Sequence, residues 1–93
     1  MQHLLVSSRR DRLADDLREL LPPSSVLLTA RGVDATLERL GRSARVDAVV
    51  TDDAAVLSAI REEVPGGLPV VLVAADASAS EVLRRVEEAL GET

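Results

Sequence analysis

The feature that most constrains the fold is the alternation of four apolar, strand-like runs with four helix-like segments along 93 residues. The first predicted strand begins with residues 4–6, and the other three cover residues 26–30, 46–51 and 68–75. After each strand, Leu or Val recurs at helical spacing. Alternating units of this kind favour a parallel sheet with helices on both faces, because right-handed crossovers return the chain beside the previous strand. The sequence therefore predicts an α/β fold and a single domain over residues 1–93.

Residues that favour helix starts precede the helical segments. Ser7 or Ser8 is expected to cap the first helix through its hydroxyl. Ser78, with Glu81 three residues later, forms the pattern of a capping box for the last helix. Residues that end helices follow the other segments: Pro22–Pro23 after the first, Gly41 after the second and Pro65–Gly67 after the third.

The composition excludes several classes of function. The chain has no cysteine, no aromatic residue and one histidine, which rules out disulfides, thiolate chemistry and stacking on nucleobases. Its net charge is -5 and its pI is about 4.7, whereas nucleic-acid binding requires a concentrated positive surface. We therefore expect no nucleic-acid partner.

No apolar segment approaches the roughly 20 residues that cross a bilayer, and the first residues do not resemble a signal peptide. We expect a cytoplasmic protein with no membrane partner.

The most specific motif is VDAVVTDD, residues 46–53, an apolar run that ends in two carboxylates. Such a run is typical of a buried parallel strand, and ligands of open α/β sheets collect at the carboxyl ends of the strands. Asp52 and Asp53 therefore mark a candidate site. Either residue can instead cap the helix that begins at Ala54, and capping explains both.

Three stretches resemble the receiver domain of bacterial response regulators: VLLTARGVDATLERL, VDAVVTDD and LPVVLVAAD, in the order of that family. The last helix, SASEVLRRVEEAL, is similar to the final helix of the family. The resemblance implies a flavodoxin-like three-layer sandwich with a four-stranded parallel sheet in the order 2-1-3-4. The fourth helix and fifth strand of the family are then missing.

The resemblance also implies that Asp52 matches the phosphoacceptor of two-component signalling. Ser7 and Ser8 stand where the family has the acidic pair that holds Mg²⁺, Ala74 replaces a hydroxyl residue, and the chain has no lysine. Losing this charge neutralisation removes terms worth several kcal/mol each. We therefore expect a pseudo-receiver that is not an enzyme, with no cofactor and no metal.

Other charged residues are expected near the same rim of the sheet. Arg9 and Arg31 follow predicted strands, as does Asp76, and together with Asp52 they can form a site for a small anion or nucleotide; Arg10 also follows the first strand. A solvated rim with exposed ion pairs is the simpler interpretation. His3 precedes the first strand, at the opposite end from the rim, and is expected to be structural.

The fourth strand reads like an interior strand, yet the order 2-1-3-4 places it at an edge. Val70, Val71 and Val73 would then lie at an exposed edge that proteins usually cover or pair. We expect this edge to associate with a second copy or another signalling protein.

Three functions follow. The first is a non-catalytic protein-interaction module in bacterial signal transduction or transcription regulation. The alternatives are a phosphoacceptor using Asp52 and a small-anion or nucleotide sensor at the rim.

Overall fold

The computed structural model describes residues 3–9, 11–42, 46–64 and 68–91, and strands alternate with helices throughout. The strands are β1 (His3–Ser7), β2 (Val26–Ala30), β3 (Ala48–Thr51) and β4 (Val70–Leu72). The helices are α1 (Asp11–Leu20), α2 (Val33–Arg42), α3 (Ala54–Glu63) and α4 (Ala79–Gly91). None of the helices in these ranges has the length and apolar character that crossing a bilayer requires.

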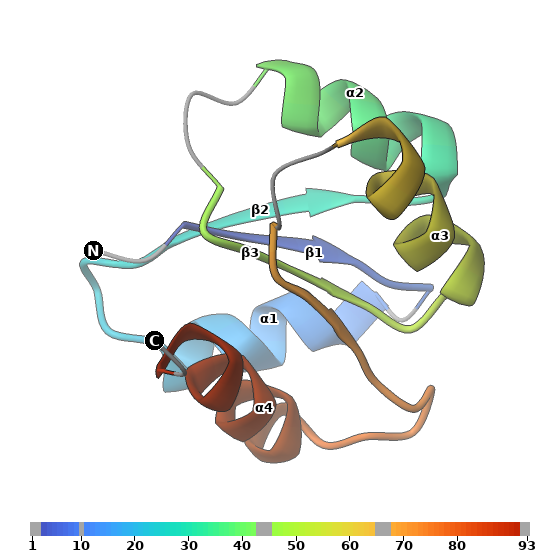
Figure 1. Cartoon of the computed structure of the whole chain (residues 1–93). Coiled ribbons are helices and arrows are strands. Elements are labelled where there is room, and N and C mark those ends of the chain that lie inside the picture. The colour runs from blue at the N-terminus through green and yellow to red at the C-terminus, as the bar shows by residue number, and fades with distance from the viewer. Residues whose placement is uncertain (1–2, 10, 43–45, 65–67, 92–93) are drawn as a thin grey trace.

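The four strands form one parallel sheet in the order β2-β1-β3-β4, as predicted. Helices α1 and α4 cover one face of the sheet and α2 and α3 cover the other (Figure 1). The α/β class and the flavodoxin-like sandwich are therefore confirmed. Because the strands are parallel, the carboxyl ends of all four lie along the same rim of the sheet.

The core has two apolar clusters, one on each face of the sheet. Successive residues of β1 alternate between them: Leu4 and Val6 pack toward α1 and α4, and Leu5 packs toward α2 and α3. All three are almost completely buried, which explains why β1 is apolar without a polar alternation.

The start of α1 differs from the prediction. Helix α1 begins at Asp11, so Ser7 and Ser8 are not its caps. Ser7 ends β1, and its hydroxyl and that of Ser8 bond to residues from other elements. Long-range partners at the end of the sheet thus replaced the local capping contact that the sequence suggested. The helix ends at Leu20, before Pro22, as expected.

Strands β3 and β4 are shorter than predicted. Strand β3 begins at Ala48, and β4 covers only Val70–Leu72 of the expected 68–75. Leu72 pairs with Thr51, the last residue of β3, so the ladder has no partner for the residues that follow Val73. The apolar run at 68–75 is therefore longer than the strand that it forms.

The end of α2 differs from the prediction, and the start of α4 agrees with it. Helix α2 continues through Gly41 to Arg42, so Gly41 does not end it. Ser78 caps α4 as expected, because its Oγ accepts a hydrogen bond from the Glu81 N–H at 3.2 Å. The predicted stop at Pro65–Gly67 lies outside the described residues.

Candidate functional site at the carboxyl end of the sheet

The two carboxylates that follow β3 hold different positions. Asp53 is the N-cap of α3: its backbone is extended, and its Oδ1 accepts a hydrogen bond from the Ala55 N–H at 2.9 Å. Its own N–H donates to Thr51 Oγ1 at 3.1 Å, which fixes the turn between the strand and the helix. Asp53 is thus the capping residue that the sequence suggested, and Asp52 is not.

Asp52 instead faces the end of β1. Its Oδ2 accepts a hydrogen bond from Ser8 Oγ at 2.8 Å, and its Oδ1 lies 3.4 Å from the backbone N of Arg9. These contacts join segments that are more than forty residues apart in the sequence. The carboxylate therefore ties the turn after β1 to the end of β3.

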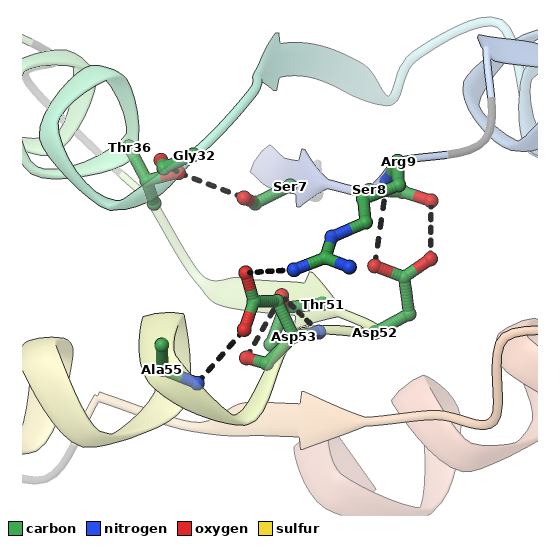
Figure 2. Close-up of polar contacts among 9 residues, drawn as sticks. All are labelled: Ser7, Ser8, Arg9, Gly32, Thr36, Thr51, Asp52, Asp53 and Ala55. Carbon is green, nitrogen blue, oxygen red and sulfur yellow. Dashed lines mark hydrogen bonds and ion pairs between the residues drawn. The ribbon is translucent and has the colours of Figure 1, made fainter.

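The Arg9 side chain lies across these strand ends, with its guanidinium directed at Asp53 (Figure 2). Its Nη2 is 3.5 Å from Asp53 Oδ2. The Arg9 side chain is 81% exposed, so solvent screens the pair and its contribution to stability is small. The pair nonetheless places a cation of the protein itself beside the two carboxylates.

A buried hydroxyl pair lies behind the rim. Thr36 Oγ1 is 2.8 Å from Ser7 Oγ and 2.6 Å from the carbonyl oxygen of Gly32, and Thr36 and Ser7 are almost fully buried. A hydroxyl carries one hydrogen and a carbonyl only accepts, so Thr36 donates to Gly32 and Ser7 donates to Thr36. Gly32 itself has a φ of +86°, a backbone conformation that favours glycine in this turn.

Thr36 and Thr51 are the residues of this region that the sequence interpretation missed. A signal for Thr36 existed, because it lies three residues after Val33 on the inward stripe of α2. A polar residue on such a stripe requires a hydrogen-bond partner, and Ser7 together with Gly32 provides it.

Arg31 is oriented toward the turn after β1. Its Nη2 donates to the carbonyl oxygen of Arg9 at 3.2 Å. Beside it, a hollow of about 320 Å³ lies between α1 and β2. Its polar lining residues are two arginines, two hydroxyl residues and one acidic residue: Arg18, Arg31, Ser8, Thr29 and Asp15. Of the predicted rim set, therefore, Ser8 and Arg31 share a hollow.

Asp76 is not part of this arrangement. It lies on an exposed turn after β4, and within the described ranges no hydrogen bond or ion pair connects it to the other rim residues. Arg10, the other rim candidate, lies outside the described residues. The predicted rim is therefore realised around the ends of β1, β2 and β3.

His3 lies at the opposite end of the sheet, as expected, but as the first residue of β1. Its N–H donates to Asp47 Oδ2 at 2.8 Å, and its carbonyl oxygen accepts from the Asp47 N–H at 2.7 Å. These bonds fix the register of β1 and β3, which is a structural role.

The predicted association edge is only partly exposed. Strand β4 is an edge strand, but Val71 and Val73 are buried in the cluster beneath α4, with 8% and 4% exposure. Val70 packs partly buried on the other face. Leu72 is the apolar residue of the strand that is exposed, at 39%. The side chains of Val71 and Val73 thus belong to the core.

In the described part of the chain, no group of three or more histidine or acidic side chains could hold a metal ion. Asp52 and Asp53 are the acidic residues at the strand ends, and their oxygens already accept hydrogen bonds from Ser8 and Ala55. Comparison of the chain with protein-family models, curated proteins and solved structures finds no match.

Proposed function

We propose that this chain is a non-catalytic, receiver-like protein-interaction module of bacterial signal transduction or transcription regulation. The observation that supports it most is the state of the carboxylates. Asp52 accepts from Ser8 and Asp53 caps α3, so both acids hold the fold together at the place where a phosphoacceptor would have to react.

The surroundings of Asp52 support the same proposal. A carboxylate that attacks a phosphoryl group must be brought close to other anions, which requires cations that persist through the transfer. Among the residues that the structure describes, the cation that forms an ion pair at these strand ends is Arg9, whose side chain is largely exposed and directed at Asp53. Ser8 offers Asp52 a hydroxyl, which is neutral.

Intact-mass measurement after incubation with acetyl phosphate and Mg²⁺ tests the proposal. We expect no gain in mass for the natural chain, and the same result for Asp52→Asn and Asp53→Asn. A gain of one phosphoryl group that Asp52→Asn abolishes and Asp53→Asn retains would overturn it in favour of the phosphoacceptor function.

A second candidate, the binding of a small anion, is favoured by the hollow beside Ser8 and Arg31. Arg31 and Thr29 both line this hollow, and a guanidinium together with a hydroxyl is suited to phosphate or carboxylate oxygens. Thermal unfolding followed by circular dichroism, with and without millimolar phosphate or nucleotides, tests this function. Stabilisation that disappears in Arg31→Gln would support it, and no stabilisation by any anion would exclude it.

A further inference from the structure

The sheet has two edge strands, and they are not equivalent. Strand β4 has three residues, whereas β2 at the other edge has five. Two backbone hydrogen bonds, from Val49 N to Pro69 O and from Val73 N to Thr51 O, join β3 to the β4 segment. They show that the odd-numbered residues of this segment direct their backbone N–H and C=O groups toward β3. In a parallel ladder the alternate residue, Leu72, then directs its backbone groups outward.

The β4 edge is also partly covered. Arg85 of α4 donates from Nη1 to the outward carbonyl oxygen of Leu72 at 3.0 Å. A short edge with a charged side chain bonded to its free acceptor is a feature that disfavours pairing with another strand.

The β2 edge is longer, and its outward groups can be identified from the register. The His3 carbonyl faces β3, so the backbone groups of Leu4 and Val6 face β2. Leu4 is opposite Leu27 and Val6 is opposite Thr29, so Leu27 and Thr29 direct their N–H and C=O groups away from the sheet. No hydrogen bond from another described residue reaches these outward groups.

We propose that the occupant of this edge is β2 of a second copy, paired antiparallel about a two-fold axis at Leu28. In that register Leu27 lies opposite Thr29 of the second copy, and the reverse. Both are outward-facing, so each pair exchanges two N–H···O=C bonds and every outward group finds a partner. The two sheets become one continuous sheet.

The charges beside β2 do not oppose this pairing. Asp15 and Arg18 of α1 line the hollow that contains Thr29, and they form an ion pair with each other at 3.2 Å. The helix beside this edge therefore presents a neutralised pair of charges to a second copy.

This inference rests on the proposed function, because it names the partner of the interaction module. Light scattering of the natural chain between about 5 and 500 µM tests it, a range that brackets the affinity of a small interface. We expect the mass to rise from one chain to two across this range. A chain that stays monomeric and also takes no phosphoryl group would overturn the pairing and leave the proposed function intact.

Matched proline variants at the two edges locate the interface. Thr29→Pro removes an outward N–H of β2, and Leu72→Pro removes the corresponding group of β4; proline is tolerated where the N–H faces away from the sheet. We expect Thr29→Pro to be monomeric and Leu72→Pro to dimerise like the natural chain. If Thr29→Pro does not fold, Thr29→Lys serves instead. The opposite pattern would assign association to β4 and overturn the inference.

Discussion

Two neighbouring residues of the same type act differently because they face different elements. Asp53 caps the helix that follows it, and Asp52 accepts from Ser8 and faces the end of β1. One step along an extended backbone reverses the direction of a side chain, which is why adjacent carboxylates reach different partners. Both aspartates thus hold elements of the fold in place.

The cap predicts a measurable loss of stability. Asp53→Ala removes the acceptor of the Ala55 N–H, and we expect the free energy of unfolding to fall by about 1 kcal/mol. Asp53→Asn keeps an oxygen at the same position and should lose clearly less. Urea unfolding followed by circular dichroism at 222 nm measures both; equal losses would show that charge, not capping, is the main contribution.

The buried hydroxyl pair predicts a coupling. Thr36→Val keeps the shape of the side chain but leaves the Ser7 hydroxyl without its acceptor, so we expect a loss of about 1–3 kcal/mol. In the double variant Ser7→Ala/Thr36→Val neither hydroxyl is left alone. Its loss should be smaller than the sum of the single losses in a double-mutant cycle. Additive losses would contradict a bond between the two side chains.

At the scale of the elements, the edge strands show how position changes the role of an apolar residue. Strand β4 alternates between residues that face the core and Leu72, which is exposed, although its sequence is apolar throughout. Its outward carbonyl is bonded by Arg85 from α4. The helix therefore contributes to protecting the edge as well as to the core.

Lysine substitutions in β4 separate these roles. Val71→Lys places a charge in the cluster beneath α4, and we expect a loss of several kcal/mol or failure to fold. Leu72→Lys changes an exposed position and should lose less than about 1 kcal/mol. Thermal unfolding of the two purified variants measures the difference. Similar stability of both would show that Val71 is not a core residue.

At the scale of the whole molecule, a chain with no aromatic residue builds its core on both faces of one small sheet. A domain of this size has a small free energy of unfolding, roughly 5–14 kcal/mol. Association through an edge of the sheet would therefore be a substantial fraction of the total stability.

Association predicts that thermal stability depends on concentration. If the folded chain dimerises, a hundredfold increase in concentration adds about 1 kcal/mol per chain, which is roughly 4–8 °C in Tm for a domain of this size. Circular dichroism in cells of different path length measures this, because the chain has no tryptophan or tyrosine for fluorescence. Thr29→Pro should show a Tm that does not change with concentration, and an equal shift in that variant would exclude β2 as the contact.

Much of the architecture could be predicted from the sequence, because helical and strand periodicity are local properties. The alternation of elements, the cap at Ser78 and a cap at Asp52 or Asp53, which proved to be Asp53, were predicted from the residues themselves. The strand order was predicted from the resemblance to receiver domains, and it is confirmed. The helix cap expected at Ser7 or Ser8 and the length predicted for β4 were wrong. The Ser8 and Ser7 hydroxyls bond to Asp52 and Thr36, and β4 ends where its pairing with Thr51 ends. These partners are distant in the sequence.

The sequence by itself determined which segments are strands and helices and which faces are apolar, because burial of a stripe is encoded in residue spacing. Only the tertiary structure decided what the polar residues do. It paired Ser8 with Asp52 and Ser7 with Thr36, and it placed Arg85 against the outward carbonyl of the β4 edge. The physical reason is that a hydrogen bond requires its two partners within about 3 Å, and only the packed chain brings distant residues that close.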